Sequence, residues 1–327
     1  MPASEVTYRE AIGRALSDSM AADRRVVLLG EDVGKAGGVF KVTAGLYEKF
    51  GPEQVLDTPI SETGFLGAAV GMALVGFRPI VELMFADFAG VAFDQIVNQA
   101  AKYRYLSAGQ MGVSLVVRGV GGAGLGFASQ HSQTTESWFL SVPGLKVVVP
   151  ATPQDAYSLL RTAVDDPDPV IYLEHKALYV TKGPLDVNLP PLPIGVADVV
   201  RSGTDCTIVA SLAMVREALT AGAHLANDGI EIEVINVRTL APLDIDTIVR
   251  SVERTSRLLV VEEEVGSGGW AGNVVARVCS QAIEFFDGAP AILGTAEAPI
   301  PFSQPLERLA VPSAATIADK VRQMVGH

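Results

Sequence analysis

A carboxylate at Glu62 opens the first segment whose residue types could do chemistry, ISETGFLGAAVG at residues 60–71. Glu62 stands where an extended pattern gives way to a helical one, so it can bind a ligand or exchange a proton at a helix start. The alternative is an acidic residue in the first turn of an ordinary core helix. Four small residues then share one helical face, which predicts close packing against another helix: Gly64, Gly67, Ala68 and Gly71.

The segment FADFAG, residues 85–90, follows a strand-like run and supplies apolar side chains. Met84, Phe85 and Phe88 predict a wall for a flat ring, because ligands gather at the carboxyl ends of parallel strands. The alternative is that these are core residues beneath a helix that begins near Val91.

A glycine-rich loop, RGVGGAGLGFASQHSQ at residues 118–133, leads into a polar cluster around His131. Glycine lets a backbone approach a ligand closely or move. Histidine titrates near neutral pH, where it can donate to a carboxylate or carry a proton. A single histidine in a protein most often has a structural role. A structural and a functional role for His131 therefore both stay open.

A rival function comes from two glycine patterns that satisfy the dinucleotide-binding fingerprint, at 119–124 and 266–271. No amphipathic helix directly follows the first, and the next strand ends at Pro150 without an acidic residue to hold a ribose. The strand after the second pattern does reach Glu297, so a nicotinamide-dependent dehydrogenase stays open. A non-catalytic regulatory subunit is a third hypothesis.

Two aspartates and several carbonyls lie together in AVDDPDPV, residues 163–170. Oxygen atoms grouped in this way can hold a monovalent cation. The ordinary interpretation of such a segment is a solvated Asp-Pro turn.

Alternating strands and helices must position these residues. Continuous apolar strands separated by helices predict a parallel sheet covered on both faces. We therefore expect an α/β protein with a domain at residues 1–185, a proline-rich linker at 186–200 and a smaller α/β domain at 201–327. The strand-like runs of the first domain are residues 26–30, 79–85, 113–119, 145–150 and 169–174, and its helical runs are 8–25, 64–76, 93–106 and 153–166.

Composition and charge exclude several classes of function. The 327 residues are 49% hydrophobic and 19% charged, as in a folded protein. A net charge of −12 without a lysine or arginine cluster argues against nucleic-acid binding. Apolar runs are too short to span a bilayer, the two cysteines form no disulfide or metal pattern, and a signal-peptide layout is missing. We expect a cytoplasmic protein.

In this order, the segments resemble the beta subunits of thiamine-diphosphate-dependent 2-oxo acid dehydrogenases, which act on pyruvate, branched-chain 2-oxo acids or acetoin. The matching stretches cover almost the whole chain. They are LLGEDVG, LDTPISETGFLGAAVGMA, FADFAGVAFDQIVNQAAKYRYLSAG, QHSQTTESWF, PGLKVVVPATPQDA, PDPVIYLEHKALY, LPIGVADVVRSG, VINVRTLAPLDIDTIVRSV and PIPFSQPLERLAVPS.

The resemblance implies a pyrimidine-binding domain followed by a transketolase-type C-terminal domain. It implies that Glu62 contacts the aminopyrimidine ring of thiamine diphosphate, that Phe88 stacks on this ring beside Met84, and that His131 serves the substrate carboxylate and acyl transfer to lipoamide. It also implies a potassium site, in which the last position is Asn in some relatives. Its ligands would be the carbonyls of Leu115, Ala163 and Val164 and the side chains of Asp166 and Asp168.

The resemblance further implies partners. The GDG motif that holds Mg²⁺ and the diphosphate is absent from this chain, as expected if an alpha subunit supplies it in a tetramer of two alpha and two beta subunits. The C-terminal domain would dock the lipoyl acyltransferase component, whose basic binding domain the acidic run 262–264 would suit. Phe88 and QHSQTTESWF favour pyruvate or acetoin as substrate, whereas AKYRY is similar to the branched-chain type.

Overall fold

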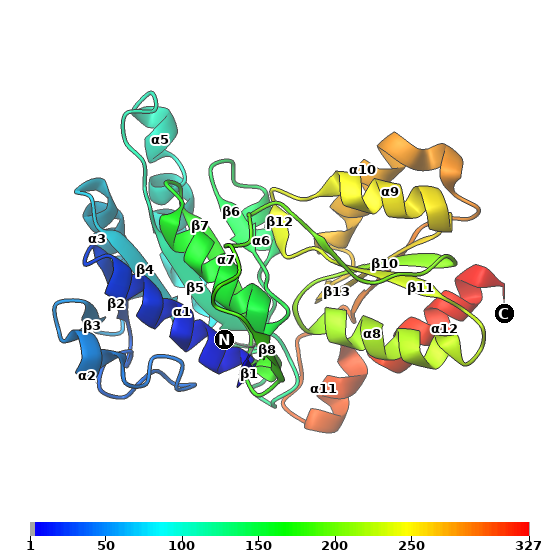
Figure 1. Cartoon of the computed structure of the whole chain (residues 1–327), viewed down its shortest axis with the longest axis horizontal. Coiled ribbons are helices and arrows are strands. Elements are labelled where there is room, and N and C mark those ends of the chain that lie inside the picture. The colour runs from blue at the N-terminus through cyan, green and yellow to red at the C-terminus, as the bar shows by residue number, and fades with distance from the viewer. Residues whose placement is uncertain (1–3, 327) are drawn as a thin grey trace. The chain divides into compact units, whose positions relative to one another are not determined.

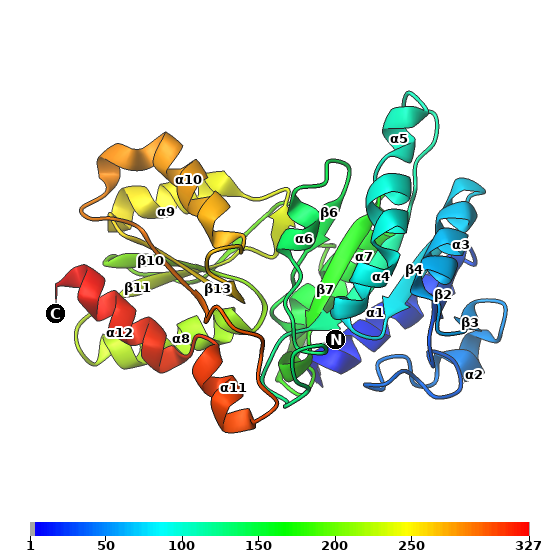
Figure 2. The same ribbon diagram turned by 180° about the vertical axis from the view of Figure 1, so that it is seen from behind.

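The computed structural model describes residues 4–326, which form two compact α/β units. The first unit comprises the chain up to Gly121 together with Trp138–Ile194. The second comprises Gly122–Ser137 and the chain from Gly195 onward. A short segment from the first half of the chain therefore belongs, by its contacts, to the second unit. Figures 1 and 2 show the elements of both units from opposite sides.

The first unit is built on a sheet in the order β6-β7-β5-β4-β2-β3, in which every neighbouring pair is parallel. β2, β5 and β7 are buried along their whole length, as parallel strands covered on both faces should be. The strands are β2 (Val26–Gly30), β3 (Val55–Asp57), β4 (Arg78–Leu83), β5 (Val116–Gly121), β6 (Lys146–Val148) and β7 (Val170–His175); β1 (Ser4–Thr7) and β8 (Lys182–Leu185) form a separate antiparallel pair.

Helices cover both faces of this sheet. α1 and α7 pack together on one face, and α3 and α4 lie on the other (Figures 1 and 2). The sequence starts α1 with a capping box between Thr7 and Glu10, and starts α7 with Thr152 as N-cap and a proline in its first turn. The bounds are α1 (Tyr8–Ala22), α2 (Leu46–Phe50), α3 (Glu62–Leu74), η1 (Ala86–Phe88), α4 (Ala89–Asp94), the π-helix η2 (Gln95–Ala100), α5 (Tyr103–Leu106), α6 (Ser137–Leu140), α7 (Pro153–Asp165) and η3 (Lys176–Leu178).

The second unit has a sheet in the order β14-β13-β10-β11-β9, parallel except for β9. α8 and α12 pack on one face and α9 and α10 on the other (Figure 1). The strands are β9 (Asp198–Arg201), β10 (Cys206–Ala210), β11 (Ile232–Asn236), β12 (Thr239–Ala241), β13 (Leu258–Val265) and β14 (Ala291–Thr295). The helices are α8 (Leu212–Ala226), α9 (Ile245–Thr255), α10 (Ala271–Ala282), η4 (Ile283–Phe285), α11 (Gln304–Ala310) and α12 (Ala314–Val325).

The two-domain α/β architecture that the sequence predicts is confirmed. Two details differ from expectation. Part of the expected linker is ordered, because Asp198–Arg201 joins the second sheet as its antiparallel edge strand. The helical run expected at residues 93–106 is divided among α4, η2 and α5. Within residues 4–326, none of the helices combines the length and the hydropathy needed to cross a bilayer.

Candidate active site

Glu62 lies at one end of the first sheet. It is the first residue of α3, which follows β3 and packs on β4. Only 7% of the residue is exposed. The carboxyl ends of β2, β3 and β4 are neighbours because these strands are parallel and adjacent. Glu62 therefore brings a buried carboxyl to the edge of the sheet where ligands of such folds bind.

A second carboxyl, Glu31, lies beside Glu62 and was not identified from the sequence. It directly follows β2, is 7% exposed, and its Oε1 has no hydrogen-bond partner within residues 4–326. Burial raises the pKa of Glu31, and the neighbouring Glu62 and Asp32 raise it further. The signal was available, because an acidic residue at the carboxyl end of the apolar run VVLLG is a typical ligand-binding position.

The aromatic residues after β4 occupy the same edge of the sheet. Met84 directly follows the strand and Phe88 ends the short helix η1, and both are partly exposed. Phe85 is buried instead and packs edge-on against Phe88 with ring centroids 5.9 Å apart. Met84 and Phe88 thus remain accessible to a ligand, whereas Phe85 supports Phe88 from within the core.

A buried ion-pair network links the strands of this part of the sheet. The guanidinium of Arg118 donates to both carboxylate oxygens of Glu174, at 2.7 and 3.0 Å, and to Glu82 at 2.6 Å. The hydroxyl of Tyr179 donates to Glu174 at 2.7 Å. These side chains come from three adjacent strands, β4, β5 and β7, and from the turn after β7. They tie together the strands whose ends carry the site.

His131 lies in the second unit, in the loop 122–137 that joins β5 to α6. It is partly exposed, and its backbone N–H donates to the carbonyl of Ala128 at 3.4 Å. Three backbone amides of this loop donate to carboxylates of β13 and α11. Glu62, Met84 and Phe88 are therefore grouped in the first unit, and His131 is held by the second.

Neither glycine fingerprint forms a dinucleotide site. Gly119 and Gly121 lie inside β5, where a Cβ on Gly119 would stand 3.1 Å from the backbone of Ala86. The second pattern does form a strand–turn–helix. The carboxyl of Glu262, however, lies at the start of α10 and accepts a hydrogen bond from the N–H of Ala271 at 2.9 Å. That carboxyl occupies the helix start where a pyrophosphate would bind. The nicotinamide alternative is therefore not favoured.

The acidic run 262–264 differs from the expectation of an exposed docking patch. Glu262 is fully buried and Glu264 is 6% exposed. Their side chains point into the second unit because alternate residues of β13 face its interior and receive hydrogen bonds there. The net charge of −12 remains, but this run does not supply a surface for a basic partner.

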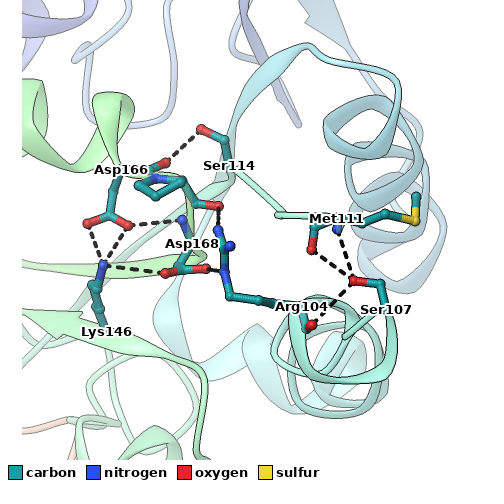
Figure 3. A network of polar contacts seen from close by, with 8 residues as sticks. Arg104, Ser107, Met111, Ser114, Lys146, Asp166 and Asp168 are labelled. Atoms are coloured by element: carbon teal, nitrogen blue, oxygen red, sulfur yellow. Dashed lines mark hydrogen bonds and ion pairs between the residues drawn. The ribbon is translucent and has the colours of Figure 1, made fainter. Parts of the chain in front are cut away.

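The aspartates expected at the potassium site are paired with side chains of the chain itself, as Figure 3 shows. The ammonium of Lys146 lies 2.6 Å from each carboxylate oxygen of Asp166 and 3.7 Å from Asp168. Arg104 donates to the other oxygen of Asp168, and Ser114 donates to the Asp166 carbonyl at 2.8 Å. The negative charge of this turn is therefore compensated by two cationic side chains.

The three carbonyls expected at the same site also accept hydrogen bonds. Leu115 accepts from the N–H of Val170 at 2.9 Å and Ala163 from the N–H of Asp166 at 3.3 Å. Val164 accepts from the guanidinium of Arg78 at 2.8 Å. A carbonyl oxygen has two lone pairs, so each retains one acceptor position. Among residues 4–326, no group of three or more His, Cys, Asp or Glu side chains is arranged to hold a metal ion.

Comparison with known proteins defines the class. Residues 4–182 match the transketolase pyrimidine binding domain and residues 195–317 match the transketolase C-terminal domain. A solved structure described as a split gene transketolase, inactive beta4 tetramer, has a TM-score of 0.81 at 24% identity and covers 98% of both chains. The fold and the domain matches make this a transketolase-type protein.

Similar curated proteins narrow the class further. The acetoin:2,6-dichlorophenolindophenol oxidoreductase subunit beta of Cupriavidus necator is 46% identical over 98% of both chains. The pyruvate dehydrogenase E1 component subunit beta of Rickettsia felis is 43% identical over 98% of both. The mitochondrial subunit beta-2 of Oryza sativa subsp. japonica is 45% identical over 95% of this chain and 84% of its own length. The chain belongs to the family of beta subunits of thiamine-diphosphate-dependent 2-oxo acid and acetoin dehydrogenases.

Proposed function

We propose that the chain is the beta subunit of a dehydrogenase, with two alpha and two beta subunits, that decarboxylates pyruvate or cleaves acetoin. The acyl group passes to lipoamide of an acyltransferase component. One observation carries the proposal: the buried carboxyls Glu62 and Glu31 lie together at the ends of parallel strands, beside the accessible side chains of Met84 and Phe88. Relatives named for pyruvate and for acetoin are similar to the same degree, so both substrates belong to the proposal.

These residues fit thiamine diphosphate. When bound, the cofactor supplies a nucleophilic carbon that attacks the 2-oxo group and accepts the electrons of the broken carbon–carbon bond. Glu62 would hydrogen-bond the aminopyrimidine ring, where burial excludes competing water. The ring of Phe88 would stack on the pyrimidine with Met84 beside it. Glu31 would place a second buried carboxyl close to Glu62, and burial and the charge of Glu62 raise its pKa.

His131 has a separate role in the proposal. Its imidazole would donate a hydrogen bond to the substrate carboxylate and would pass a proton to the lipoamide sulfur during acyl transfer. Its position in a glycine-rich loop suits this role, because such a loop can approach both partners closely.

An alpha subunit is part of the proposal because this chain lacks the GDG motif and leaves an apolar surface beside Glu62. Ile60 is 85% exposed and Val75, at the other end of α3, is 75% exposed. A Cβ on Gly71, on the face between them, would meet nothing within 4 Å. A helix face of small residues flanked by exposed aliphatic side chains suits close packing against another chain. The alpha subunit would also hold Mg²⁺.

Calorimetry with thiamine diphosphate and Mg²⁺ tests the shared site. We expect heat of binding only when the chain is assembled with its alpha subunit. We expect Glu62→Gln to lower turnover of pyruvate by about 10²–10⁴-fold, the usual contribution of a general acid–base group. Glu48→Gln, an exposed carboxyl on α2, is the matched control and should be fully active. Cofactor binding by the chain alone, or full activity of Glu62→Gln, would overturn the proposal.

We also propose a potassium ion at the turn after α7, bound by the free lone pairs of the Leu115, Ala163 and Val164 carbonyls and by the side chains of Asp166 and Asp168. The ion would compete with Lys146, which already contacts Asp166. Thermal unfolding in potassium, sodium and choline chloride tests this. We expect a higher midpoint in potassium and a larger difference in Lys146→Met, since the competing ammonium is gone. Equal midpoints in all three salts for both proteins would contradict it.

The cytoplasm is the proposed location, which the free cysteines Cys206 and Cys279 suit. The plant relatives are described as mitochondrial. Fractionation of the source cells, with detection of this chain by antibody, distinguishes the two compartments.

A further inference from the structure

Carboxylates hold the loop that carries His131 at three places. The N–H of Ala123 donates to Glu263 at 2.5 Å, the N–H of Gly126 to Glu307 at 2.9 Å, and the N–H of Ser137 to Glu264 at 2.9 Å. The hydroxyl of Ser137 donates to the second oxygen of Glu264. Backbone amides bonded to carboxylates are stronger contacts than neutral pairs. The loop 122–137 is therefore anchored near its start, in its middle and at its end.

The loop needs these contacts because part of its backbone is strained. Ala128, three residues before His131, has a φ of 63°, in the left-handed region that costs an alanine conformational energy. Gly122, Gly124 and Gly126 have φ of 85°, 102° and 74°. The three glycines adopt these angles without strain, whereas Ala128 keeps its conformation because its surroundings hold it.

Two carboxyls lie side by side at the third anchor of the loop, where Ser137 donates to Glu264. Glu136, at the end of the loop, is 3% exposed, and Glu264 on β13 is 6% exposed. Ser137, the next residue after Glu136, donates to both carboxylate oxygens of Glu264, so the two carboxyls are neighbours. Oε2 of Glu136 has no hydrogen-bond partner within residues 4–326. Two neighbouring buried carboxyls favour a state with one proton between them, because two buried anions repel each other.

The charges around the pair strengthen that argument. Burial raises the pKa of Glu136, and Glu264, Glu263 and Glu262, all from β13, raise it further. Burial also raises the pKa of Glu264, against hydrogen bonds from Ser137, Trp270 and Glu136. Glu307 on α11 also contacts the loop, through the N–H of Gly126. The surroundings of the pair are acidic, so they favour its protonated form.

We propose that Glu136 and Glu264 are positioning residues that share one proton and, in that state, hold the 122–137 loop and its His131 in place. The inference rests on the proposed function for the role of His131, but the state of the loop is independent of it. In the shared state one carboxyl donates and the other is the anion that accepts from Ser137. Loss of the proton leaves two buried anions, whose repulsion is relieved when the loop opens.

The direction of the pH effect follows from these shifts. Both pKa values are raised in the folded protein, so the order of the loop is complete at low pH and is lost as pH rises through the folded values. If one proton leaves for each opening event, the opening constant rises by up to tenfold per pH unit between the lower pKa of the open loop and the raised pKa of the closed loop. Below the first pKa and above the second, the opening constant is independent of pH.

Hydrogen exchange of the 122–137 peptides in the assembled enzyme, corrected for the intrinsic rate at each pH, measures this opening. We expect wild type to show the rise of up to tenfold per pH unit. Glu136→Gln should abolish it, because the amide N–H₂ donates to Glu264 permanently and takes the place of the shared proton. Glu264→Ala should exchange quickly at every pH. Glu217→Gln, which removes a carboxylate bonded to Ala314 elsewhere in the unit, should behave as wild type.

The pH profile of lipoamide acylation gives a second readout. In wild type the rate should fall as pH rises and the loop opens, and in Glu136→Gln the fall should move to higher pH. An opening constant that depends on pH equally in wild type and Glu136→Gln overturns the inference. Failure of the proposed function would appear differently, as no binding of thiamine diphosphate to the assembled enzyme with the exchange results unchanged.

Discussion

Replacement of Arg118 by Met tests whether the ion-pair network under the candidate site holds the first unit together. Arg118 is 2% exposed and Glu174 1%, so solvent offers little screening to either charge. The variant keeps an unbranched chain of similar length but leaves Glu174 and Glu82 without their cation. Removal of one partner from a buried pair costs about 3–5 kcal/mol, because the remaining charge is buried without compensation.

The expected shift in unfolding temperature follows from that cost. In a unit of about 180 residues, 1 kcal/mol corresponds to a change of about 2–4 °C. We therefore expect Arg118→Met to unfold about 6–20 °C below wild type. The pKa values of Glu82 and the tyrosines around Glu174 are already raised by burial. Protonation of the unpaired carboxyls at low pH should therefore recover part of the loss.

Differential scanning calorimetry measures the shift, read on the transition of the first unit since two units need not unfold together. Arg104→Met is the control, because Arg104 is 43% exposed and its pair with Asp168 should contribute less than about 1 kcal/mol. Arg118→Lys keeps the charge without the bidentate contact and should fall between the two. A midpoint for Arg118→Met within the range of the control would refute the structural role assigned to this network.

Two further predictions concern the second unit. Gly269→Ala places a Cβ 2.2 Å from Oε1 of Glu262, so we expect it to lower the free energy of unfolding by about 1–3 kcal/mol. Gly272→Ala is the control and should leave that free energy unchanged, because its Cβ would meet nothing within 4 Å. Equal stability of the two variants in thermal unfolding would contradict the packing argument. Burial raises the pKa of Glu262 from 4.5 to about 8, so the native state binds more protons than the unfolded state between these values, and stability declines with pH across that window. Glu262→Gln should remove this decline in denaturant titrations, and a pH dependence unchanged from wild type would show that Glu262 is not the group responsible.

The fold was accessible from the sequence where apolar runs were continuous. VVLLG and PVIYLE predict buried parallel strands, and the structure confirms β2 and β7. The sequence analysis places residues 198–200 in a linker because the segment around them carries four prolines and no clear periodicity. The structure shows a short, half-exposed edge strand there, β9. The attachment of residues 122–137 to the second unit was also unpredictable, since it depends on contacts with carboxylates more than a hundred residues away.

The candidate site also contains some residues that the sequence predicts and others that it does not. The sequence predicts Glu62, Met84 and Phe88 because each follows a strand or begins a helix, a position that local pattern reveals, and their roles stay predictions. Glu31 satisfies the same rule but is not among the residues that the sequence analysis predicts. Glu136 and Glu264 follow no local rule, because a run such as EEEV gives no sign of which side chains face inward. Their pairing comes from the register of β13 against a distant loop, which is a property of the folded chain.

The origin of the loop contacts has a consequence during synthesis on the ribosome. The partners of Ala123, Ser137 and Gly126 lie 140, 127 and 181 residues further along the chain. At about 5–20 residues per second, the loop waits roughly 6–36 s before its carboxylates exist. Throughout that interval the amides of Ala123, Gly126 and Ser137 lack these carboxylate partners, even though β5 and β6 can already pair with β7. His131 therefore reaches its place only when translation is almost finished, so a chain released early would carry a folded sheet and an unformed site.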